Sequence, residues 1–204
     1  MQAAARMVSV ISSVPPARRI LIRTVRLKKL DSPMPEYADI YALASKRTEQ
    51  AITDFLDHFL PGRIESADEY EIPQYSGSPI TVYTHAEDLI RHCCGNPNEV
   101  HAIYWRSDQQ SEYAMVFFLE DGGLIFGVST PAEDRHRVDW IADELKRFLD
   151  AEGVIVTYED LPPESTEEFV AFFQSLPSHP DDTARRSRAH RPIKGEQDAR
   201  GNRR

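Results

Sequence analysis

The chain of 204 residues has only two cysteines, and it lacks any apolar run near the roughly 18 residues that a membrane span needs. Two adjacent cysteines, Cys93 and Cys94, cannot form the disulfide framework of a small secreted domain. The sequence therefore favours a reducing, cytoplasmic setting with no membrane association. With 41% hydrophobic and 28% charged residues, the composition is typical of a globular protein and excludes collagen, a coiled coil or a wholly disordered chain.

Basic residues are scarce in the middle of the chain and gather at its two ends. Residues 34–177 hold 28 acidic and 9 basic side chains, a net charge of -19, whereas residues 1–33 carry +6 and residues 178–204 carry +4. We therefore predict one acidic globular domain over 34–177, preceded by a basic N-terminal extension and followed by a disordered basic tail. The extension has three open interpretations: a targeting peptide, a true tail, or an untranslated stretch ahead of a start at Met34. The change in charge and pattern at Met34 favours the last.

The apolar spacing of the domain predicts four helices. Residues Tyr37 to Leu60 repeat apolar side chains every three or four positions, which is typical of a helix. Three further helices are expected to begin at capping boxes that start with Thr84, Thr130 and Ser165. In each box the hydroxyl and the carboxylate three residues later would satisfy backbone donors of the first turn.

Segments rich in β-branched and aromatic residues predict the strands. They are His101–Arg106, Glu112–Leu119, Leu124–Ser129 and Val154–Tyr158, with a hairpin turn at Asp121–Gly123. The order of these elements predicts an α+β fold. In it, a largely antiparallel sheet, made of a three-strand meander plus one or two strands, packs with about four helices.

Motifs of enzymes and cofactor sites are missing. The sequence has no phosphate-binding glycine loop, no H-E-x-x-H and no dinucleotide fingerprint, so we predict no cofactor and favour a protein that is not an enzyme. Gly127 to Pro131 resembles the nucleophile elbow G-x-S-x-G, but proline replaces its last glycine, and a helix cap at Thr130 explains the segment better. Cys93, Cys94 and nearby histidines lack the paired spacing of a zinc site, so we predict core packing and no metal.

Two sets of residues are candidate sites. The first lies in the acidic loop Ile64–Ser78, where carboxylates alternate with tyrosines that would suit a basic protein surface: Asp68, Glu69, Tyr70, Glu71 and Tyr75. The alternative for this loop is a solvated surface without a function. The second set lies on one predicted strand and would line a small-ligand pocket: His101, Tyr104 and Arg106. Pairing of Arg106 with a carboxylate is the structural alternative, and we favour it over an anion site.

Two functions follow from these candidates. The first is a non-catalytic module that sequesters or inhibits a basic protein partner, as an antitoxin or an immunity protein does. The second is an enzyme or small-ligand-binding protein with its pocket between the sheet and the helices. The charge of -19 repels phosphate and argues against binding of nucleic acid by the domain. The oligomeric state stays open.

Overall fold

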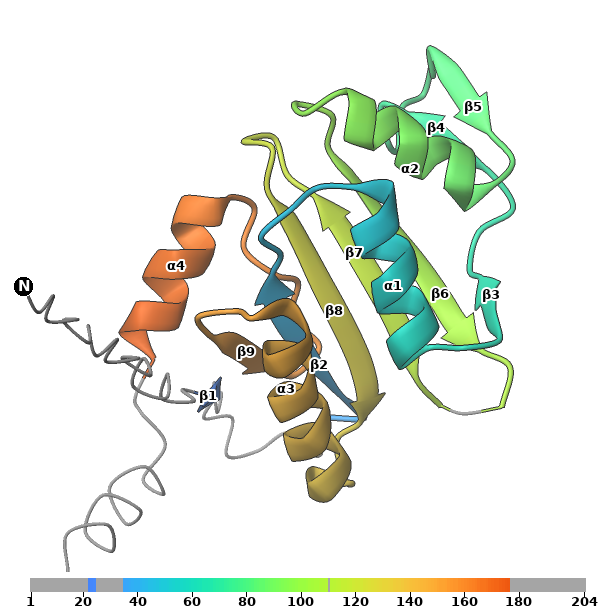
Figure 1. Cartoon of the computed structure of the whole chain (residues 1–204). Coiled ribbons are helices and arrows are strands. Elements are labelled where there is room, and N and C mark those ends of the chain that lie inside the picture. Colours follow the sequence, from blue (N-terminus) through green and yellow to red (C-terminus); the bar gives the residue numbers. More distant parts are fainter. Residues whose placement is uncertain (1–21, 25–34, 110, 177–204) are drawn as a thin grey trace, which may run out of the picture.

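The computed structural model describes residues 22–24, 35–109 and 111–176. These residues form a seven-stranded sheet in the order β1-β9-β2-β8-β7-β6-β3 and a two-stranded sheet of β4 and β5 (Figure 1). All neighbouring strands are antiparallel except β1 and β9. The strands are β1 (Ile22–Thr24), β2 (Tyr37–Leu43), β3 (Arg63–Glu65), β4 (Tyr70–Ile72), β5 (Thr81–Tyr83), β6 (His101–Ser107), β7 (Tyr113–Phe118), β8 (Leu124–Pro131) and β9 (Val154–Thr157).

Four helices complete the fold: α1 (Glu49–Phe59), α2 (Ala86–Gly95), α3 (Arg135–Leu149) and α4 (Thr166–Ser175). The predicted α+β class, with a largely antiparallel sheet and four helices, is confirmed. Among the described residues, no helix is both long and apolar enough to pass through a lipid bilayer. Strand β1 comes from the basic N-terminal segment. The other predictions for that segment, and those for the tail over 178–204, concern residues outside the described ones.

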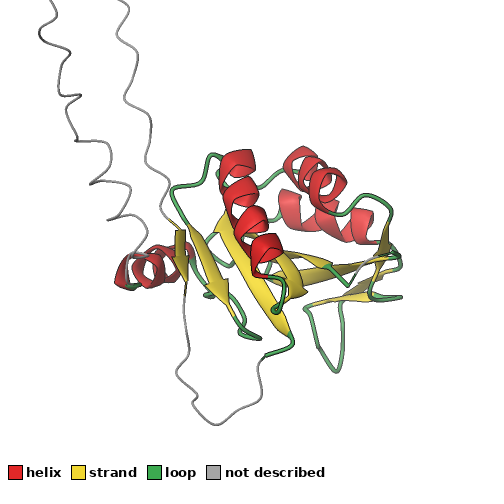
Figure 2. Cartoon of the chain, turned by 90° about the horizontal axis from the view of Figure 1, so that it is seen from below, coloured by secondary structure: helices red, strands yellow, loops and turns green. Residues whose placement is uncertain are grey.

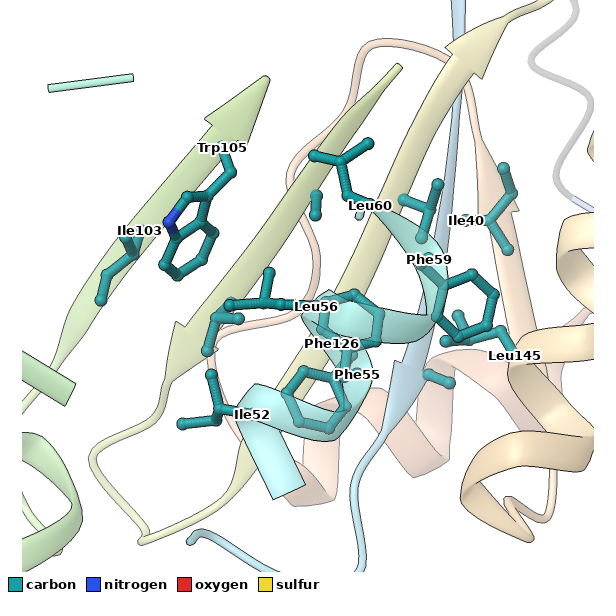
Figure 3. Close-up of a cluster of buried hydrophobic side chains, with 14 of the residues drawn as sticks. Ile40, Ile52, Phe55, Leu56, Phe59, Leu60, Ile103, Trp105, Phe126 and Leu145 are labelled. Carbon is teal, nitrogen blue, oxygen red and sulfur yellow. The ribbon is translucent and has the colours of Figure 1, made fainter. Parts of the chain in front are cut away.

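One face of the sheet carries the main core. Helices α1, α2 and α3 cover this face, and their apolar stripes meet the inward side chains of the strands (Figures 2 and 3). Phe55 of α1 stacks on Phe126 of β8 with 4.3 Å between the ring centroids, and both rings are fully buried. Ile103 and Trp105 of β6 face the same side, because side chains two residues apart along a strand point to one face.

The opposite face packs a second, smaller core. Phe169 of α4 lies among the side chains of β2, β7 and β9, including Tyr41 and Ile155. The Tyr41 ring crosses directly over Gly127, where an added Cβ would come within 2.7 Å of a ring carbon, so only glycine fits there. Strand β7 lies between β6 and β8 and is buried on both faces, which explains its continuous apolar run.

The predicted helix over Tyr37–Leu60 is wrong in its first part. Residues Tyr37–Leu43 form β2, and the helix begins only after Thr48, whose hydroxyl accepts a hydrogen bond from the Ala51 amide at 3.2 Å. Strand β2 lies inside the sheet and is buried on both faces, so its apolar residues do not alternate with polar ones. Their spacing then continues into α1 and imitates a single helical period.

Two of the three predicted capping boxes are also wrong. Helix α2 begins after His85, and Glu65 of β3 accepts the hydrogen bond of the Ala86 amide instead of a local threonine. Thr130 lies within β8, and the side chain of Asp134 caps α3. The third box is confirmed, because the Ser165 hydroxyl accepts from the Glu168 amide at 3.1 Å.

Arg47, in the link between β2 and α1, fixes the end of α2 against the β7–β8 hairpin. Its guanidinium donates to the backbone oxygens of Cys93, Asn96, Glu99 and Leu119. These carbonyls include the acceptors that the last turn of a helix leaves unpaired. Arg47 therefore holds in place α2, the helix that packs against α1 and β5.

Candidate binding groove

A groove of about 370 Å³ lies at the β3 edge of the sheet, where the chain leaves β3 and runs through β4. We call residues 66–75 the groove segment. Figure 1 shows this region beside α2, at the end of the sheet farthest from β1. The groove is lined by Ser66, Ala67, Glu69, Tyr70, Glu71, Gln74, Tyr75, His101, Ala102 and Tyr104.

The groove unites most of the two candidate sites from the sequence. Four of the five acidic-loop residues line it, and so do His101 and Tyr104 of the predicted pocket. Asp68 is exposed but does not line it. Arg106 also lies elsewhere, exposed on β6 opposite Tyr113. Among the described residues no carboxylate forms an ion pair with Arg106, so the pairing that we expected for it stays a prediction.

The predicted loop Ile64–Ser78 contains regular structure that holds the groove segment in place. Strand β3 pairs with the end of β6, and the Ser66 amide donates to the Tyr104 carbonyl at 3.0 Å. Tyr70 is buried, and its hydroxyl donates to the Glu65 carboxylate at 2.8 Å. Burial, followed by this carboxylate, raises the pKa of Tyr70. Glu65 also accepts from the first amide of α2. One carboxylate therefore bonds both to Tyr70, at the start of β4, and to the start of α2.

Gln74 is a site residue that the sequence analysis missed. Its side-chain oxygen accepts from the Ala102 amide at 2.8 Å, and its side-chain nitrogen donates to the Ala102 carbonyl at 3.1 Å. The carboxamide thus bonds to β6 as a neighbouring strand would, beyond the point where β3 stops pairing. A glutamine within a polar loop carries no local signal for such a contact.

His101 serves as an anchor at the base of the groove. It is 2% exposed, and its Nε2 and Nδ1 atoms each lie 3.1 Å from a backbone oxygen, those of Glu71 and Ala102. Burial lowers the pKa of His101, so the neutral ring prevails at neutral pH. With both ring nitrogens facing the backbone, His101 is not placed to exchange protons with a ligand.

Two tyrosines form the accessible aromatic surface. Tyr75 is 85% exposed and has a φ of 60°, a left-handed conformation that costs a non-glycine residue about 1–2 kcal/mol. Tyr104 is half-buried, and its ring lies nearly perpendicular to that of Phe117, with 5.8 Å between the ring centroids. Burial, and then the nearby Tyr75 hydroxyl, raise the pKa of Tyr104. Tyr75 and Tyr104 both line the groove, and the side chain of Tyr75 projects into solvent.

The carboxylates of the groove form no ion pair with any described residue. Most of the nine bases between residues 35 and 176 are already bound elsewhere: Arg63 to Asp57, Arg91 to Asp88, Arg137 to Glu112, Arg147 to Glu144, and Arg47 and Lys146 to backbone oxygens. No ion pair within the described ranges involves Asp68, Glu69 or Glu71. The groove therefore presents negative charge that the domain itself does not neutralise.

The other motifs of the sequence do not form a second site. Burial raises the pKa of Cys93 to about 12, which disfavours the thiolate that metal binding or redox chemistry needs. Over the described ranges, no three His, Cys, Asp or Glu side chains gather as a metal site would require. Ser129 lies inside β8 beside Asp39, not at a strand-to-helix turn, so the resemblance to a nucleophile elbow does not extend to the structure.

A smaller cavity of about 230 Å³ lies between α4 and the turn from α3 to β9. It contains none of the predicted site residues. Comparison of the chain with protein-family models, with curated proteins and with solved structures gave no match. The chemistry of the groove is therefore the basis for a function.

Proposed function

We propose that the protein is a non-catalytic binding module that sequesters a basic protein partner in the cytoplasm, as an antitoxin or an immunity protein does. The observation that carries this proposal is the groove, which Glu69 and Glu71 line together with Tyr75 and Tyr104, and in which neither carboxylate forms an ion pair with a described residue. Carboxylates attract a basic surface over long range, and tyrosine rings supply contact area at the centre of an interface.

The anchoring of the groove segment supports the same proposal. The contacts of Gln74, Tyr70 and the Ser66 amide fix the segment before any partner arrives. A prearranged surface loses less conformational entropy on binding than a mobile loop does. The exposed ring of Tyr75 is then available without a rearrangement of the backbone.

A small-ligand-binding protein or enzyme is the second candidate. The groove volume of about 370 Å³ falls within the range of small-molecule pockets, and this observation favours it. The groove lies at the sheet edge, however, and not between the sheet and the helices. Its titratable interior groups are committed, since Tyr70 bonds to Glu65 and both nitrogens of His101 face carbonyl oxygens. We therefore favour the binding module.

The test is a pull-down with the full chain from a nuclease-treated lysate of its own organism, washed at rising salt. We expect a basic protein at equimolar yield that is released as the salt concentration rises. A triple variant of the acidic loop, Asp68→Asn, Glu69→Gln and Glu71→Gln, should no longer retain this basic protein. A control triple on α3 and the turn before it, Glu133→Gln, Asp139→Asn and Asp143→Asn, has the same net charge and should still retain the basic protein. An empty bait, or equal retention by both variants, contradicts the proposal.

A further inference from the structure

The groove has the chemistry of a pocket for a single planar cation. We infer that it receives an arginine side chain of the basic partner, with the guanidinium against the rings of Tyr75 and Tyr104 and the carboxylates of Glu69 and Glu71 as acceptors. This inference rests on the proposed function and makes it more specific. It names the side chain that the groove recognises.

The size of the groove favours a side chain over a larger element. A helix is about 10–12 Å across, which a groove of about 370 Å³ cannot enclose. The same volume accommodates one long side chain from a partner whose remaining surface lies against the acidic exterior. The groove segment is fixed to β6 by Gln74 and His101, so its walls are in place before binding.

The walls favour a cation that is flat. A cation over the face of a tyrosine ring is attracted by the electrons of the ring, and arginine makes this contact more often than lysine does. The guanidinium is planar, is weakly hydrated and can donate two parallel hydrogen bonds to one carboxylate. A lysine ammonium is a compact, strongly hydrated charge that gains less from an aromatic wall.

Other ligand classes fit the groove less well. Phosphates and carboxylates would be repelled by Glu69 and Glu71, which have no compensating base among the described residues. A metal ion would need three or more suitable side chains together, and the described part of the chain has no such group. A neutral aromatic ligand could stack on Tyr75 but would leave the two carboxylates without a partner.

The experiment compares hexa-arginine with hexa-lysine, two peptides of equal charge, by calorimetric titration of the full-length protein at low ionic strength. We expect hexa-arginine to bind about fivefold more tightly. Tyr75→Ala should abolish that preference, whereas Tyr75→Phe keeps the ring and should retain it. Tyr75 is 85% exposed, so its replacement by alanine should leave the fold intact.

A second pair of variants tests the carboxylates. Glu69→Gln should weaken binding of hexa-arginine more than Glu133→Gln, which removes an equal charge from a residue outside the groove, just before α3. In NMR spectra of the protein, the resonances of the Gln74 side-chain amide and of the Ala102 backbone amide should shift on addition of hexa-arginine, because both residues line the groove.

The outcomes separate this inference from the proposed function. Equal affinity for both peptides, with no effect of Tyr75→Ala, would mean attraction by surface charge alone, and the arginine pocket would be refuted while the binding module stood. Absence of binding by either peptide would also refute the pocket. The pull-down with the charge-matched triple variants decides the proposed function independently of the peptides.

Discussion

Two regions of the molecule differ in whether their carboxylates are paired with a base. At the start of β7, Glu112 is 5% exposed and receives two bonds from Arg137, at 2.6 and 2.9 Å, and one from the Thr130 hydroxyl at 3.3 Å. In the groove, Glu69 and Glu71 have no basic partner within the described ranges.

The difference follows from burial. A buried carboxylate destabilises the fold unless its charge is matched, so Glu112 needs Arg137. A carboxylate that stays in contact with water needs no match, and its charge remains available to a ligand. The comparison shows that Glu112 is matched to a charge inside the fold, whereas the carboxylates of the groove can contribute to binding.

The largest change in stability is expected when Glu112 loses its partner Arg137. Arg137→Ala leaves Glu112 buried without a counter-charge, so we expect the free energy of unfolding to fall by about 3 kcal/mol. Chemical denaturation measures this change. Arg135→Ala, at an exposed neighbour, is the control and should change the value by less than about 0.5 kcal/mol. A loss below about 1 kcal/mol for Arg137→Ala would show that the pair does not stabilise the fold.

A smaller effect is expected where the groove segment meets the sheet. Gln74→Ala removes two hydrogen bonds to Ala102 and should lower the free energy of unfolding by about 1–2 kcal/mol. Hydrogen exchange of the Ala102 amide should become faster, since its acceptor is lost. Gln50→Ala, which removes only an exposed contact to Asp54, serves as the control. Unchanged exchange at Ala102 would mean that Gln74 does not anchor the segment.

The smallest of these effects depends on pH. Burial lowers the pKa of His101 in the folded state, whereas the unfolded value is about 6.5. As the pH falls below about 6.5 the unfolded chain takes up this proton more readily, so the protein loses stability. The two backbone carbonyls and Glu99 stabilise the charged ring and reduce the effect, while His92 acts in the opposite direction.

The measurement compares the unfolding free energy at pH 7 and pH 5 for the natural chain and for His101→Phe. The variant cannot take up the proton, so its stability should fall less between the two pH values. An equal fall in both proteins would show that another group causes the pH dependence.

Much of the fold follows from local sequence. The strands β6, β7 and β8 and the box at Ser165 could be predicted because their signals lie within a few residues of one another. The starts of α2 and α3 could not be, since Glu65 caps α2 from a distant strand and Asp134 lies four residues beyond the expected Thr130. Strand β2 was missed because burial on both faces removes the alternation that marks a strand.

The candidate site could be predicted only in pieces. Its two halves, around Tyr75 and around Tyr104, are about thirty residues apart in the chain, and the pairing of β3 with β6 brings them together. No pattern in either segment predicts that pairing. The contact between Gln74 and the backbone of Ala102 depends on the same tertiary arrangement, so it too requires the structure.

The measurement that tests the central claim most directly is hydrogen exchange of the full chain, alone and in complex with the basic protein recovered by the pull-down. We expect the protection gained on binding to concentrate in residues 66–75 and 101–104, the two walls of the groove. Protection centred on α3 or α4, with no change at the groove, would contradict the account, because the partner would then recognise a different surface.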